Sequence, residues 1–293
     1  MSNDFQTVVR SIRDLPPMPV VASKVLELLG DPDVDYRGVA QAISSDPAVS
    51  ARLLKVANSA FYSMKRQIKT LDHAIAIVGE RTLRSLVLAA SLEGMNKSYG
   101  LLEKMLWEDA MGCAIGGRIL ARKFSSADPE EAFLAGLFRH LGKIVMNYSD
   151  PDTYRALVEA AYSEGVSTTE LEGRFFPYSH EVVGAAVLEK WNFSKSLVMA
   201  VLHHEDLNIA SGDDETDDFG DFDSKAVLAL TATVNLSGHI CLKLGLGQRE
   251  PNADLNAFAC LGAQALNLSE DQVDDAVSEI NEVFSENRDF FIG

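Results

Sequence analysis

The segment Asp128–Tyr148 constrains the fold most strongly, because it predicts a long helix that other helices must cover. Asp128 and Pro129 suit the N-cap and the first helical position. At 3.6 residues per turn, apolar side chains share an arc of about 120°. They are Phe133, Leu134, Leu137, Leu141, Ile144, Val145 and Tyr148. His140 falls at the edge of this stripe and Arg139 points well away from it. The segment is therefore predicted to be the central helix of the second half.

The rest of the chain repeats the same kinds of helix signal without strand-like alternation of apolar and polar residues. Asp35, Asp46 and Thr70 are predicted N-caps, and Gly30 and Gly79 are predicted to end helices. Further helices are predicted at 2–13, 20–29, 36–44, 48–57, 71–78, 81–92, from 107 onward, 152–163, 168–176, 180–191, 196–204, 225–244, 255–266 and 268–284. The sequence thus predicts an all-α fold.

Composition limits the function classes. The net charge of −17 and the pI near 4.7 argue against nucleic acid or an anionic membrane surface as partners, because both select for basic patches. Cys113, Cys241 and Cys260 are odd in number and widely spaced, which is typical of buried thiols in a reducing compartment. No signal-peptide pattern occurs and no apolar run approaches about 18 residues. We therefore expect a cytoplasmic protein.

Three segments of the first half carry a family resemblance: LPPMP at 15–19, SSDPAVSARLLKVANSAFY at 44–62 and IKTLDHAIAIVGERTLRSLVL at 68–88. They resemble the HDOD family, the HD-related output domain of bacterial signalling proteins, whose pattern is D-P-x-L-x-x-K-L-L-x-x-A-N-S-x-x-Y. Matching positions are Asp46, Pro47, Leu53, Leu54, Ala57, Asn58, Ser59 and Tyr62. The resemblance extends from about Leu15 to about Glu205 and implies an HD-like bundle in a signalling context.

Asn58 and Ser59 belong to that pattern and have two possible roles. Polar residues just past a helix usually close it by hydrogen bonding to backbone groups. A role in contacting a ligand is the alternative. We predict the structural role.

The segment FLAGLFRHLGKIVM, residues 133–146, resembles the central helix of HD metal-dependent phosphohydrolases, which has the pattern G-L-L-H-D-I-G-K. In those enzymes the adjacent His and Asp bind metal. The corresponding residues here are Arg139 and His140, and a guanidinium has no lone pair to donate to a metal. The resemblance therefore implies that the scaffold is retained and the chemistry lost.

Other HD-like positions give weak candidates for a metal site: Asp109, His140, His180, His203 and His204. Asp109 takes the place of the first HD histidine, and we expect it to be exposed in the first turn of its helix. Only one residue of the His203-His204 pair is expected to face a shared site, since successive helical residues diverge by about 100°. Asn235 is the nearest counterpart of the last HD aspartate. No catalytic residue and no cofactor are expected, with a divalent metal as the alternative.

The predicted organisation has four parts: an N-terminal helical subdomain at 13–97, a degenerate HD-like subdomain at 98–210, an acidic flexible loop at 211–224, and C-terminal helices at 225–293 that pack on the HD-like subdomain. A calcium-binding loop is the alternative for 211–223, but the spacing does not fit an EF-hand.

These observations predict a non-catalytic signal-transduction module that contacts other signalling proteins. Two alternatives stay open. One is a metal-dependent phosphohydrolase with an atypical metal site, and the other is a sensor that binds a small nucleotide without turnover.

Overall fold

The computed structural model describes residues 15–59, 68–95, 100–209 and 223–291. Over these residues the chain consists of helices joined by turns and short connections, and no strand is present. The predicted all-α class is confirmed. The predicted helix at 2–13 and nearly all of the predicted acidic loop lie outside the described residues.

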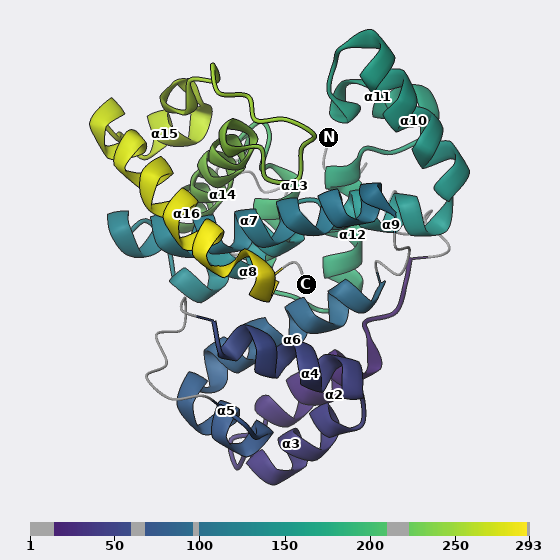
Figure 1. Cartoon of the computed structure of the whole chain (residues 1–293), viewed down its shortest axis with the longest axis vertical. Coiled ribbons are helices and arrows are strands. Elements are labelled where there is room, and N and C mark those ends of the chain that lie inside the picture. Colours follow the sequence, from purple (N-terminus) through teal and green to yellow (C-terminus); the bar gives the residue numbers. More distant parts are fainter. Residues whose placement is uncertain (1–14, 60–67, 96–99, 210–222, 292–293) are drawn as a thin grey trace.

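The first described helices form the N-terminal lobe, which lies at the bottom of Figure 1. They are α2 (Val20–Leu29), α3 (Tyr36–Ser44), α4 (Pro47–Ala57), α5 (Leu71–Val78) and α6 (Glu80–Met95). The predicted N-caps are confirmed, since Asp35, Asp46 and Thr70 each accept a hydrogen bond from a backbone amide in the first turn.

Asn58 fastens the end of α4 to a distant backbone segment. Its Nδ2 donates to the carbonyl oxygens of Leu54 at 2.7 Å and Ile68 at 2.8 Å. Its Oδ1 accepts from the amide of Ile68 at 2.7 Å. The side chain therefore satisfies backbone groups on both sides of 60–67, which is the structural role predicted for it. Its backbone is right-handed, with φ −87°.

The remaining helices form the C-terminal lobe, the upper part of Figure 1. They are α7 (Leu101–Phe124), α8 (Pro129–Phe138), α9 (Leu141–Ser149), α10 (Pro151–Glu164), α11 (Thr168–Phe175), α12 (His180–Lys190), α13 (Lys195–Leu202), α14 (Ser224–Leu244), η2 (Ala257–Ala259), α15 (Leu261–Ala265) and α16 (Glu270–Phe291). The helices α7 and α14 pack together at its centre, with α8 against both.

The predicted continuous helix over 128–148 is wrong, because it breaks at Arg139 and His140 into α8 and α9. Adjacent side chains on a regular helix diverge by about 100°. Here both side chains turn to the same carboxylate, that of Asp109. Beyond the break Leu141, Ile144 and Val145 are buried as expected, but Tyr148 is 62% exposed, and Phe138 is completely buried.

Two further boundaries differ from the predictions. The helix expected to open at Trp107 begins at Leu101, which places Asp109 well inside α7. The single helix expected at 255–266 is instead the short η2 followed by α15. Ser269 and Gln272 form a capping box through reciprocal hydrogen bonds at the start of α16.

Buried polar contacts join the two lobes. Arg118 of α7 is 1% exposed, pairs with Glu130 of α8 and lies over the ring of Phe133. The same Glu130 accepts a hydrogen bond from Ser85 of α6. A charge buried in this way must be paired, so the network fixes α6 of the N-terminal lobe against α7 and α8.

By length and composition alone the helix α14 is apolar enough to cross a membrane, with a mean hydropathy of 1.4 over an 18-residue window. However, 67% of that window is buried inside the structure. This burial is typical of a core helix. The three cysteines are buried and free, as predicted.

We predict that Asn58→Ala lowers the free energy of unfolding by about 1–3 kcal/mol, because the amide and carbonyl of Ile68 lose their partner. Urea denaturation measures this change. Asn58→Asp should be no less damaging, because it keeps the acceptor but turns a carboxylate oxygen toward the carbonyl oxygens of Leu54 and Ile68. An unchanged stability in Asn58→Ala would contradict the structural role.

Candidate functional site

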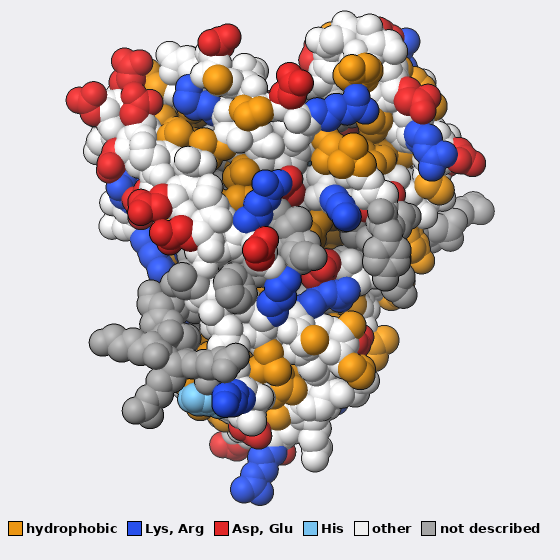
Figure 2. Space-filling view, viewed as in Figure 1, with side chains coloured by type: hydrophobic (Ala, Val, Ile, Leu, Met, Phe, Trp, Pro, Cys, Tyr) orange, Lys and Arg blue, Asp and Glu red, His pale blue; other side chains and the backbone are white. Residues whose placement is uncertain are grey.

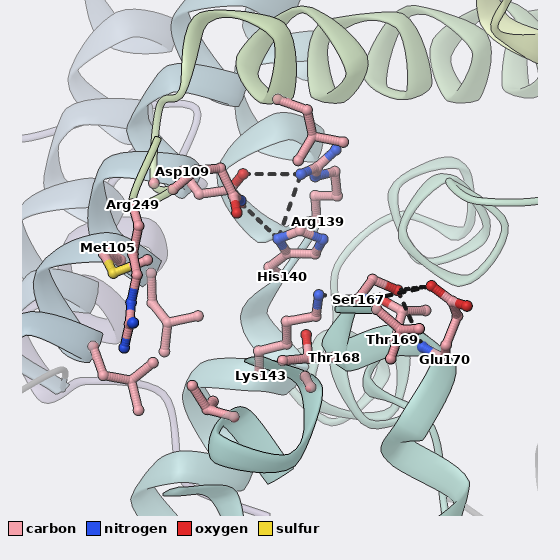
Figure 3. Close-up of a pocket in the computed structure, with 18 of the residues that line it drawn as sticks. Met105, Asp109, Arg139, His140, Lys143, Ser167, Thr168, Thr169, Glu170 and Arg249 are labelled. Carbon is pink, nitrogen blue, oxygen red and sulfur yellow. Dashed lines mark hydrogen bonds and ion pairs between the residues drawn. The ribbon is translucent and has the colours of Figure 1, made fainter. Parts of the chain in front are cut away.

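The candidate site is organised around one buried carboxylate, that of Asp109 in α7. Its Oδ1 accepts a hydrogen bond from Nη2 of Arg139 at 2.9 Å, and its Oδ2 lies 2.6 Å from Nδ1 of His140. Asp109 is 3% exposed, Arg139 4% and His140 9%. Figure 3 shows Arg139 and His140 converging on Asp109 from the junction of α8 and α9. One carboxylate thus pairs with a guanidinium and an imidazole together.

Space for the Arg139 guanidinium comes from Gly238 on α14, where a Cβ would collide with it. Burial by itself disfavours the charged guanidinium, but the surrounding acidic groups together, with the carboxylate of Asp109 foremost, more than offset this and raise the pKa of Arg139. Arg139 therefore stays protonated and fills the position beside His140. The expectation that it points away from the core is wrong.

Three histidine rings meet next to this ion pair. His140 lies between α8 and α9, His180 is the first residue of α12, and His204 follows α13. The ring centroids are 5.0 Å apart for His140 and His180, 5.5 Å for His140 and His204, and 5.3 Å for His180 and His204. Gly142 on α9 makes this approach possible, because a Cβ there would collide with the backbone carbonyl of His180.

Buried acceptors orient the other two rings as Asp109 orients His140. Nδ1 of His180 lies 2.9 Å from Oε2 of Glu172, and Nδ1 of His204 lies 2.7 Å from the carbonyl oxygen of Val201. Burial lowers the pKa of both His140 and His180 well below the usual range. Those two rings are consequently neutral at pH 7. Burial also raises the pKa of Glu172 to about 7.

The structure brings Asp109, His140, His180 and His204 together, four of the five residues singled out from the sequence. The fifth, His203, faces elsewhere: its side chain is 20% exposed and its Nδ1 lies 3.2 Å from Asp206. One residue of the histidine pair therefore faces the site, as expected. The expectation of an exposed Asp109 is wrong because α7 begins earlier than predicted.

A cleft of ≈ 790 Å³ opens beside the histidines. Figure 2 shows the molecule hollowed here, between α10–α11 and α14–α16. Lys143 of α9 reaches into it and donates to Oγ1 of Thr169 at 3.2 Å, and burial lowers the pKa of Lys143. On another wall the guanidinium of Arg249 lies 4.3 Å from the centre of the Tyr162 ring. The cleft thus combines an aromatic surface with cationic groups, of which Figure 3 shows Lys143 and Arg249.

The family model of the HDOD domain matches residues 15–207. This chain belongs to the HDOD family. A curated relative is an uncharacterised protein of Treponema pallidum (strain Nichols), 24% identical over 202 residues. That alignment covers 69% of the HDOD chain and 39% of the relative, so the chain spans well under half of the relative's length.

Solved structures share the fold of this HDOD chain. An HDOD domain protein of unknown function from Geobacter sulfurreducens has a TM-score of 0.73 and 21% identity, over 96% of each chain. A Shewanella amazonensis SB2B protein, provisionally named a phosphohydrolase, has a TM-score of 0.69 and 21% identity, over 99% of this chain and 98% of its own. At such identities the likeness shows the fold alone.

The residues of this HDOD chain do not fit the two-metal centre of HD phosphohydrolases. Arg139 is protonated and paired with Asp109, so the first position of the dyad has no lone pair for a metal. Asn235, at the place of the last aspartate, uses its amide for the backbone. Its Nδ2 donates to the carbonyl of His204 at 2.8 Å and its Oδ1 accepts from the amide of Gly262 at 2.9 Å. Asn235 therefore positions His204.

The sequence predictions missed Glu172, Glu205 and Lys143. Glu172 is 1% exposed although α11 is mostly polar, and nothing in the local sequence indicates that its side chain turns inward. Glu205 directly follows the histidine pair, and Lys143 occupies the lysine position of the pattern G-L-L-H-D-I-G-K. Those two could have been found from the same motifs that gave the histidines.

We predict that Arg139→Met lowers the free energy of unfolding by about 3–5 kcal/mol, because it leaves Asp109 buried without its guanidinium. Adding Asp109→Leu in the same chain should recover much of the loss, which a double-mutant cycle by urea denaturation measures. Arg174→Met is the matched control, because its pairing with Glu164 is exposed and worth at most about 1 kcal/mol. Additive effects at Arg139 and Asp109 would argue against their coupling.

We also predict an acid-labile contribution from His140. Its pKa is depressed in the folded protein, so below about pH 6.5 the unfolded chain binds a proton that the folded chain does not, and stability is lost as the pH falls. Glu172, whose pKa is raised to about 7, contributes with the opposite sign, because its contribution to the stability of the protein is lost as the pH rises.

The diagnostic quantity is therefore the difference between wild type and His140→Gln, in buffer containing EDTA. The free energy of unfolding of wild type should fall more steeply below pH 6.5, by up to about 1.4 kcal/mol per pH unit. His73→Gln, at an exposed histidine, is the control and should keep the wild-type slope. Parallel curves for wild type and His140→Gln would contradict a neutral His140.

Proposed function

We propose that this HDOD chain is a non-catalytic signal-transduction module that acts through contacts with other signalling proteins. The observation that carries the proposal is the buried pairing of Arg139 with Asp109, with Oδ1 and Nη2 2.9 Å apart. A guanidinium at the first position of the dyad cannot bind a metal, and His140 at the second position supplies no bridging carboxylate. The charge of −17 supports a cytoplasmic protein whose partners are neither nucleic acids nor membranes.

The alternative of an HD-type phosphohydrolase has less support. Its chemistry requires a carboxylate that bridges two metal ions and generates a nucleophile from bound water. The dyad aspartate is replaced by His140, and the carboxylate nearest to it, that of Asp109, already accepts from both Arg139 and His140. The alternative is still tested below, because the structurally similar Shewanella protein is provisionally named a phosphohydrolase.

A second candidate function is binding of a small nucleotide without turnover, and the cleft favours it. Lys143 supplies a cation at the polar end, and Tyr162 with Arg249 supplies an aromatic surface and a second cation. Phosphate groups select cations and nucleobases select aromatic faces. Calorimetric titration with nucleotides separates this sensor from a module that acts through protein contacts alone.

We predict that neither wild type nor Arg139→His/His140→Asp hydrolyses phosphomonoesters or cyclic dinucleotides in the presence of Mn²⁺ or Zn²⁺. The double substitution rebuilds the dyad locally, but Asp109 loses its guanidinium and Asn235 still occupies the last ligand position. A working site also needs its ligands held by correctly placed neighbours. The expected result is a less stable protein that is still inactive.

The amount of hydrolysis product, detected by chromatography, tests this prediction, with a catalytically active HD phosphohydrolase as the positive control. Metal-dependent hydrolysis by wild type would refute the proposed function. Activity that appears only in the double variant would show that the dyad alone separates this cleft from catalysis.

A further inference from the structure

The three site histidines present the same nitrogen to one another. Oε2 of Glu172 also accepts the backbone amide of His180 at 2.8 Å, so any proton on Glu172 resides on Oε1. Carboxylate and carbonyl oxygens only accept, and Nδ1 of each ring must therefore carry a hydrogen toward its partner. A neutral ring with its hydrogen on Nδ1 has its lone pair on Nε2.

These Nε2 atoms converge on one small volume. Nε2 of His180 and Nε2 of His204 are 3.4 Å apart. Nε2 of His140 is buried and has no hydrogen-bond partner within the described structure. Lone pairs that face one another at this distance repel unless a proton or a cation lies between them.

Glu205 completes the arrangement with a carboxylate. Its Oε1 lies 3.3 Å from Nε2 of His204, and this side chain is 42% exposed while the ring is completely buried. One ligand atom from each of His140, His180, His204 and Glu205 lies within 4.8 Å of the others. The group therefore offers three imidazoles and one carboxylate, the donor types that zinc and similar ions accept.

Two of the separations match those between the ligands of a tetrahedrally coordinated ion. Two nitrogens bonded to one zinc at about 2.0–2.1 Å and at the tetrahedral angle lie about 3.3–3.4 Å apart. The pair His180–His204 and the pair His204–Glu205 both have this separation. The hydrogen bonds from Nδ1 to Asp109, Glu172 and the Val201 carbonyl are those by which proteins orient metal-binding histidines.

We propose that His140, His180, His204 and Glu205 bind one divalent transition-metal ion, of the zinc type, as a four-ligand site. The inference reverses the expectation of no metal, and it goes beyond the proposed function without conflicting with it. Four protein ligands leave no open position for a reacting water, which is typical of structural zinc sites. Bound metal would fasten the α8–α9 junction, α12 and the end of α13 to one another.

The experiment uses the full chain without a histidine tag, stripped with a chelator and then titrated with Co²⁺. We expect saturation at one Co²⁺ per chain, with the strong visible absorption of four-coordinate cobalt. Zn²⁺ should displace Co²⁺ and raise the thermal unfolding midpoint of the stripped protein. Failure to take up one Co²⁺, or uptake with only the weak absorption of six-coordinate cobalt, would overturn the proposal.

Variants assign the ligands. His204→Ala should lower the affinity for Co²⁺ by more than about 100-fold, and Asp109→Asn, which acts through His140, by about 10- to 100-fold. His203→Ala is the matched control and should bind as wild type does, because that ring faces Asp206. Equal losses in His203→Ala and His204→Ala would overturn the assignment.

Glu205→Gln keeps the test decisive if the buried histidine variants fail to fold. Glu205 is partly exposed, so this variant should fold, with a weaker affinity for Co²⁺ and an altered visible spectrum. Glu189→Gln, at a carboxylate that pairs with Lys195 away from the site, is its control. An unchanged affinity and spectrum in Glu205→Gln would remove the fourth ligand from the proposal.

Discussion

The carboxylate of Asp109 is the interaction on which the architecture of the site depends. It accepts from Arg139 through one oxygen and contacts His140 through the other, and all three groups are almost completely buried. A buried carboxylate is stable only when its lone pairs are satisfied. Here both partners come from adjacent positions of the chain, Arg139 and His140. A continuous helix would direct adjacent side chains apart, so the helix breaks between α8 and α9.

Glycines at helix crossings let this polar centre exist inside an apolar bundle. Gly238 leaves room for the guanidinium of Arg139 on one side, and Gly142 brings the backbone of His180 close on the other. In each case a methyl group would collide with an atom of the site. The small residues thus set how closely α14 and α12 approach the α8–α9 junction, and the approach sets which rings can meet.

Much of the fold could be predicted because its signals are local. Caps such as Asp35, Asp46 and Thr70 act on amides of the next turn, so the sequence around each is sufficient. Motif positions also led to His140, His180 and His204. The direction of Arg139 and the burial of Asp109 could not be predicted in the same way, because their contact joins α7 to the α8–α9 junction, 30 positions further along the chain. Glu172 is a similar case, since only the folded chain places it against His180.

The helix α12 connects two distant parts of the molecule. It begins at His180 among the site histidines, and just past its end Trp191 donates through Nε1 to the carbonyl of Pro16 at 3.1 Å. Lys190 similarly donates to the carbonyl of Leu15 at 2.7 Å. With its 11 residues at about 1.5 Å each, α12 is a rigid rod of about 16 Å. A shift of His180 along this axis would therefore displace Lys190 and Trp191 and the segment at Leu15 and Pro16 that they contact. The helix α12 thus couples the position of the site histidines to the entry of the N-terminal lobe.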